Sequence, residues 1–232
     1  MRYRWFGLMG WFLLAGALQA GEVDVAPAPR TTPPAPPLKV ALDQVPAHQR
    51  ELVRLVIDRA ILSARGPSEA FHAKPEHFCW FLDHPDRAVI AWRRLGARCV
   101  SILPHGQKSF VWTDEHGSEV VWEAVVRTGN QRVWYADGKV KPGPLLPFIP
   151  VKAVVVLHYH QDAKEDGTPI ITQQSSIYLH TDSKSAAVVT KMLGNSAQRM
   201  VESGLEQLQL FFSGPSWYIH RHPEQAEMIL KE

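Results

Sequence analysis

The sequence predicts an α+β domain in which a curved antiparallel sheet of about six to seven strands grips one long C-terminal helix. Two patterns carry this prediction. Between residues 98 and 138, apolar and polar side chains alternate with a period of two, which is typical of half-buried strands. Residues 183–212 instead carry apolar or small side chains at steps of three and four. That spacing indicates an amphipathic helix, which needs a broad apolar surface to cover its stripe.

Upstream of the sheet, the patterns predict two helices and one short strand. Pro46 opens a helix over residues 47–64, which Gly66 and Pro67 end. The wholly apolar run 78–82 favours a buried strand. Asp83 is then positioned to cap a second helix that extends to Gly96.

Six antiparallel strands follow from the alternation and from the turn residues Gly117, Gly129-Asn130 and Asp166-Gly167. They are predicted at residues 99–103, 108–114, 118–127, 131–136, 151–161 and 170–181. The first hairpin register pairs Phe110 with Trp122 and Trp112 with Val120. The second pairs Val126 with Val133 and Ala124 with Tyr135, and it also sets Arg127 opposite Arg132. Both registers together gather one aromatic face.

The C-terminal helix is expected to begin at Asp182 and to end where Ser213-Gly214-Pro215 interrupts the pattern. Its polar side includes Glu202, Glu206 and Gln209, which we expect to face water. A short helical tail is predicted after Pro223.

The N-terminus predicts export. Residues 1–20 combine Arg2 and Arg4, an apolar run and small residues before Gly21, as a signal peptide does. Residues 21–40 are a proline-rich linker, and residues 41–232 are long enough for a single domain with its own core. The alternative to a secreted or periplasmic protein is one held at a membrane by an uncleaved signal segment. Loss of the leader leaves equal numbers of basic and acidic residues, so the charge gives no argument for nucleic acid.

The two cysteines, Cys79 and Cys99, could form a disulfide in an exported chain, or they could remain two buried thiols.

The order of elements from Phe78 to Phe212 resembles the helix-grip architecture of the START-like and polyketide-cyclase-like (SRPBCC) superfamily. The resemblance rests on the Leu82-Asp83-His84-Pro85 helix entry and on a final hairpin that runs directly into an amphipathic helix. It implies a cavity for an apolar ligand between the sheet and the helix. Members of that superfamily carry lipids, sense hormones or catalyse cyclisations, so the resemblance does not select one activity.

The aromatic face and the small residues of the long helix are the candidate binding site for an apolar or amphipathic, lipid-like small molecule. Small helix residues would leave space opposite large aromatic rings. The candidate ligand-binding residues are Phe110, Trp112, Trp122, Tyr135, Ala197, Met200 and Gly204. Tyr135, Tyr159 and Gln173 are the polar groups expected to give specificity. The alternative interpretation of the same residues is an ordinary packed core.

Other chemistry is weakly indicated. No catalytic motif is present, although Asp137 could place a carboxylate at the rim of the cavity and serve a cyclase- or hydrolase-type enzyme. His158 and His160 have a spacing that a metal ion could use, but the hairpin sets His180 too far away to complete the site. We therefore predict no metal and no cofactor. A third possibility is a structural or interaction protein with a filled core that displays Trp134 and the proline-rich arm.

Overall fold

The computed structural model describes residues 37–106, 108–141, 147–182, 184–185 and 197–230. The helices are α1 (Ala47–Asp58), α2 (Pro75–Asp83), α3 (Pro85–Arg94), α5 (Ala197–Arg221) and α6 (Ala226–Leu230), with 3-10 turns at Leu42–Gln44 and Pro223–Gln225. The strands are β1 (Leu62–Arg65), β2 (Glu69–His72), β3 (Ser101–Pro104), β4 (Ser109–Thr113), β5 (Glu119–Arg127), β6 (Gln131–Val140), β7 (Ile149–Ala163) and β8 (Pro169–His180). The predicted signal peptide, most of the linker and residues 186–196 of the predicted long helix lie outside these ranges.

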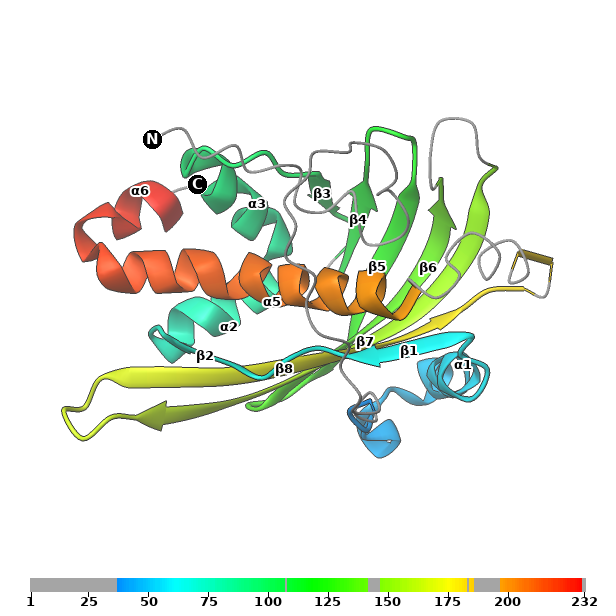
Figure 1. Cartoon of the computed structure of the whole chain (residues 1–232), viewed down its shortest axis with the longest axis horizontal. Coiled ribbons are helices and arrows are strands. Elements are labelled where there is room, and N and C mark those ends of the chain that lie inside the picture. Colours follow the sequence, from blue (N-terminus) through cyan, green and yellow to red (C-terminus); the bar gives the residue numbers. More distant parts are fainter. Residues whose placement is uncertain (1–36, 107, 142–146, 183, 186–196, 231–232) are drawn as a thin grey trace, which may run out of the picture.

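The strands form one curved antiparallel sheet in the order β1-β8-β7-β6-β5-β4-β3, with β2 also paired to β8. Figure 1 shows the sheet as an open, twisted surface with α5 lying along one face and α1 on the other. The predicted fold class is confirmed. Strands β1 and β2 are additions to the prediction, and they follow one another along the free edge of β8.

The two faces of the sheet bury two different apolar clusters. On the concave face, α2, α3 and α5 cover the larger cluster, which includes Phe78, Phe81 and Phe211. On the convex face, Val53 and Val56 of α1 pack on a smaller cluster that consists mainly of valines. Because both faces are covered over the central strands, β6 and β7 are apolar on both sides.

The first predicted hairpin register is confirmed, and the second is interrupted by a bulge. Strands β4 and β5 pair Phe110 with Trp122 and Trp112 with Val120. Between β5 and β6, Val126 does pair with Val133, but the register shifts at Val125. An extra residue in one strand exchanges the two faces beyond it.

Two elements near the N-terminus differ from the prediction. Residues 78–82 form part of helix α2 instead of a strand, and Phe78, Phe81 and Leu82 are buried at helical spacing. Pro75 at the first helical position favours this helix. The predicted helix 47–64 ends at Asp58, because the following residues pair with the edge of β8.

Helix α5 runs past the predicted stop at Gly214-Pro215 and ends at Arg221. Proline has no backbone N–H, so the carbonyl of Phe211 loses its usual helical partner. The indole Nε1 of Trp92 in α3 donates to this carbonyl at 2.9 Å. Gly214 is required beside it, since a Cβ at this position would collide with the Trp92 ring.

The predicted polar side of α5 is only partly exposed. Glu206 faces solvent, but Gln209 is buried. Its side-chain oxygen accepts from the Ser175 hydroxyl at 2.6 Å and from the Ser175 backbone N–H at 3.2 Å, and its Nε2 donates to the Pro67 carbonyl at 3.0 Å. Gln173 Nε2 also donates to the Gln209 carbonyl at 3.1 Å. These bonds tie α5 to the edge of the sheet.

Candidate functional site

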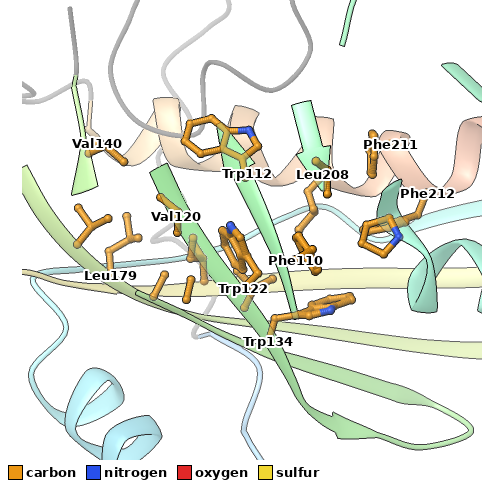
Figure 2. Close-up of a pocket in the computed structure, with 17 residues that line it drawn as sticks. Phe110, Trp112, Val120, Trp122, Trp134, Val140, Leu179, Leu208, Phe211 and Phe212 are labelled. Atoms are coloured by element: carbon orange, nitrogen blue, oxygen red, sulfur yellow. The ribbon is translucent and has the colours of Figure 1, made fainter. Parts of the chain in front are cut away.

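An apolar cavity lies between the concave face of the sheet and α5 (Figure 2). Strands β3 to β8 supply its floor, and α5 with the first residue of α3 supplies its cover. The lining residues are Pro85, Ile102, Phe110, Trp112, Val120, Trp122, Trp134, Ala136, Val140, Val151, Ala153, Val155, Ile177, Leu179, Leu208, Phe211 and Phe212. All of these lining residues are apolar or aromatic, and none is charged. Such a surface can hold an apolar molecule by burial but offers no acid or base.

The cavity is narrow in this structure. Its free volume is about 50 Å³. A cavity of roughly 150 Å³ accepts benzene, so a ligand must widen this one.

Two stacked ring pairs narrow the cavity. Phe110 of β4 stacks on Trp122 of β5 at 6.3 Å between ring centroids, with 7° between the planes. Trp134 of β6 stacks on Phe212 of α5 at 5.9 Å and 3°. The second pair joins the sheet to the helix directly. Movement of α5 away from the sheet would therefore open the cavity and separate this pair.

Three of the predicted ligand-binding residues meet at the cavity. Phe110, Trp112 and Trp122 all line it, as the first hairpin register required. Gly204 is buried in α5 but does not line the cavity, and the side chains of Ala197 and Met200 lie outside the described part of the structure.

The prediction for Tyr135 is wrong. The bulge at Val125 pairs Ala124 with Trp134 instead of Tyr135, so Trp134 faces α5. Tyr135 points to the convex face, where it packs in the valine cluster beneath α1. Its hydroxyl donates to Asp137 at 3.2 Å, and burial together with this carboxylate raises the pKa of Tyr135.

Trp134 is not among the predicted ligand-binding residues, and the alternative of an interaction protein placed it on an exposed surface. Trp134 is in fact buried against Phe212. Leu208 and Phe211 also line the cavity, and the apolar stripe of the long helix already contained both. The stripe could have identified them, whereas no local pattern identifies Trp134, because both neighbours of Trp134 are buried as well.

The polar residues predicted to give specificity do not line the cavity. Gln173 is bonded to α5 and to Glu69. Tyr159 accepts from Arg132 Nη1 at 2.9 Å and donates to the Thr128 carbonyl at 3.0 Å. Asp137 lies on the convex face beside Lys152 at 3.6 Å, so it is not at the rim of the cavity and the predicted acid–base role loses its basis.

A partly buried ion pair lies at one end of the concave face. Arg132 of β6 donates through Nε and Nη2 to both carboxylate oxygens of Asp83, at 3.1 and 3.2 Å. Arg127 approaches the same carboxylate at 3.7 Å. Asp83 therefore offsets the repulsion between Arg127 and Arg132, which the sheet pairs directly. Asp83 does not cap α3; His84 occupies the N-cap position.

The histidines of β7 and β8 each contact a different neighbour. His158 lies within hydrogen-bond distance of the Gln131 amide at 2.5 Å, and His160 approaches Asp162 at 3.2 Å. His180 pairs with Lys152 and donates to the Arg59 carbonyl. Within the described residues, no group of three metal-ligating side chains comes together.

Cys79 and Cys99 are both free thiols in the structure. Cys79 lies 3.6 Å from the Tyr159 hydroxyl, and burial raises the pKa of Cys99.

The fold and the cavity together define an open helix-grip-like protein with an apolar space beneath its long helix. Among the helices that the structure describes, none combines the length and apolar character needed to cross a bilayer.

The sequence matches no protein-family model and no curated protein. Several solved structures are similar to part of the chain at low identity and low TM-score. A conserved protein from Geobacillus kaustophilus is 15% identical with a TM-score of 0.42, over 66% of this chain and 96% of that one. A hypothetical protein from Helicobacter pylori has 9% identity and a TM-score of 0.39, over 68% and 89%. Truncated norcoclaurine synthase from Thalictrum flavum has 10% identity and a TM-score of 0.35, over 64% and 94%. These likenesses are too remote to assign a function.

Proposed function

We propose that this protein is a helix-grip protein of the START-like type that binds a small apolar molecule between the concave face of its sheet and helix α5. The observation that carries the proposal is the wholly apolar lining of the cavity, which brings six aromatic rings together without a charged group. Burial of apolar surface stabilises such a complex by about 25 cal/mol per Å² before the costs of binding are subtracted.

The small volume of the cavity determines which ligands can enter without a change in the structure. A ligand larger than a few water molecules has to displace α5 or its side chains, because the reachable space is about 50 Å³. The described bonds that hold α5 to β8 and α3 begin at Gln209 and Phe211. Leu208, one residue before them, is only partly buried at the cover of the cavity. Val201 and Leu205, earlier in α5, are buried in the core, so Leu208 is the lining residue of the described helix whose side chain is only partly buried.

The test is ligand binding by the full-length protein. Native mass spectrometry would detect an apolar compound that copurifies, and the fluorescent apolar probe N-phenyl-1-naphthylamine would report the empty cavity. Ala153→Leu adds three carbon atoms to the cavity wall and should weaken probe binding about 10-fold or more. Ala70→Leu makes the same change on an exposed position of β2 and should leave binding unchanged.

The volume also favours a second function, a structural or interaction protein whose concave core is simply filled. In that case no compound copurifies, and Ala153→Leu and Ala70→Leu bind the probe equally. An enzyme that uses this cavity is less well supported, because none of the described lining residues titrates.

We further propose that residues 1–20 direct export and that the proline-rich segment separates the domain from the cleavage site or from a membrane. The composition of this region supports the proposal. N-terminal sequencing of the protein from fractionated cells distinguishes a cleaved chain that begins near Gly21 from an uncleaved, membrane-held one.

A further inference from the structure

The indole Nε1 of Trp112 is a buried hydrogen-bond donor without a partner. The side chain lines the cavity and is 5% exposed, and its nitrogen has no acceptor in the structure. Among the described tryptophans, Trp112 alone has a buried indole nitrogen without a partner. Trp92 shows the usual arrangement, since its indole donates to the Phe211 carbonyl.

An unpaired buried donor is unfavourable, because it has given up its hydrogen bond to water and gained none. Every described neighbour in the cavity wall is apolar, so no side chain there can accept a hydrogen bond from the indole N–H. Figure 2 shows Trp112 among the side chains that line the cavity, with Val120 and Trp122 also drawn there. A ligand in this cavity therefore lies within reach of the Trp112 ring.

From the proposed binding function and this unpaired donor, we infer that the ligand is a neutral, largely apolar molecule with a hydrogen-bond acceptor, such as a carbonyl or ether oxygen, that pairs with Trp112 Nε1. A ligand without an acceptor leaves the donor unsatisfied in the complex. A carboxylate is disfavoured, because the described cavity wall holds no cation to offset the burial of its charge.

Three probes of similar size test this inference on the full-length protein. Acetophenone carries a carbonyl, α-methylstyrene has the same shape with a methylene in place of the oxygen, and benzoate carries a negative charge. Their dissociation constants are measured by NMR titration for the wild type, Trp112→Phe and Trp122→Phe. Trp122→Phe is the matched control, because it removes another indole from the same cavity.

We expect the preference for acetophenone over α-methylstyrene to fall about 10-fold in Trp112→Phe, which corresponds to the loss of one hydrogen bond worth about 1.4 kcal/mol. In Trp122→Phe both probes should weaken by the same factor. In the wild type, acetophenone should move one of the eight indole N–H resonances downfield, and that resonance should be missing from Trp112→Phe. Benzoate should bind more weakly than acetophenone.

The inference is overturned if Trp112→Phe changes the dissociation constants of both neutral probes by the same factor, or if benzoate binds as tightly as acetophenone. In either case, binding of the neutral probes would still support the proposed apolar cavity. If neither neutral probe nor N-phenyl-1-naphthylamine binds the wild type, the proposed function fails as well. Should Trp112→Phe not fold, assignment of the indole resonances in the wild type still decides the matter, because only a direct bond moves Trp112 selectively with the ketone.

Discussion

Removal of the Asp83 carboxylate should destabilise the protein substantially, because it leaves the buried Arg132 guanidinium without its ion-pair partner. Arg132 has a side chain that is 7% exposed, and Asp83 is 28% exposed. In Asp83→Ala, Arg132 loses two charge-assisted hydrogen bonds, and Arg127 is left opposite it without the intervening negative charge.

The magnitude follows from burial. Breaking one partner of a fully buried pair costs about 3–5 kcal/mol, because the remaining charge is uncompensated. Water can reach the partly exposed end of this pair, so we expect a loss of about 2–3 kcal/mol in the free energy of unfolding. For a protein of this size, that corresponds to a fall in Tm of roughly 4–12 °C.

Equilibrium urea unfolding, followed by tryptophan fluorescence and circular dichroism, measures this change. Glu51→Ala is the matched control, since the Glu51–Arg54 pair is formed at 2.9 Å but is largely exposed, and its loss should cost less than about 0.5 kcal/mol. The double variant Asp83→Ala with Arg132→Met removes both charges and should recover part of the loss. The reasoning is refuted if Asp83→Ala lowers the free energy of unfolding no more than Glu51→Ala does, or if the effects of Asp83→Ala and Arg132→Met add up in the double variant.

Three further predictions concern α5 and the convex face. Gly214→Ala should lower the free energy of unfolding by about 1–2 kcal/mol in thermal unfolding, because the added Cβ collides with the Trp92 ring although alanine favours helix. The control Ser203→Ala, at an exposed position of α5, should be neutral or stabilising. Trp92→Phe should lower the free energy of unfolding by about 1–2 kcal/mol, because the Phe211 carbonyl loses its hydrogen-bond donor. The loss should be smaller in a Pro215→Ala background, where residue 215 has a backbone N–H that can bond to the same carbonyl. Equal losses in both backgrounds would contradict this account. Burial, reinforced by the charge of Arg65, lowers the pKa of His158 below 6.5. The unfolded chain therefore binds more protons than the folded one, and the free energy of unfolding should fall as the pH drops below about 6.5. In His158→Gln this part of the dependence of the urea midpoint on pH should be flatter, and an unchanged slope would refute the account.

The sequence patterns predicted the parts of the fold in which one face of an element differs from the other. Alternation along β4 and β5 predicted the pairing of Trp112 with Val120, and the stripe of α5 identified Leu208 and Phe211 as facing the sheet. Three cavity residues followed from the same reasoning. These predictions succeeded because a shift by one residue would have exposed large aromatic rings.

The predictions failed in segments that are apolar on all sides, because the hydrophobic pattern there does not show which face of the element points to the core. Residues 133–136 are apolar on both faces of β6, so alternation could not choose between Trp134 and Tyr135. The run 78–82 is apolar throughout and suits either a buried strand or a helix. The continuation of α5 through Pro215 depends on Trp92, which lies more than one hundred residues earlier in the chain and has no local signal.

The single extra residue at Val125 has a consequence for how this protein can change by insertion or deletion. If Val125 were lost, Ala124 and Val126 would become consecutive residues opposite Trp134 and Val133, which are already their partners. Both halves of β5 would then keep their faces, and Trp122 and Trp134 would stay on the cavity side. The hairpin therefore carries one residue more than regular pairing requires, and a deletion at this point should leave the stacked rings in place.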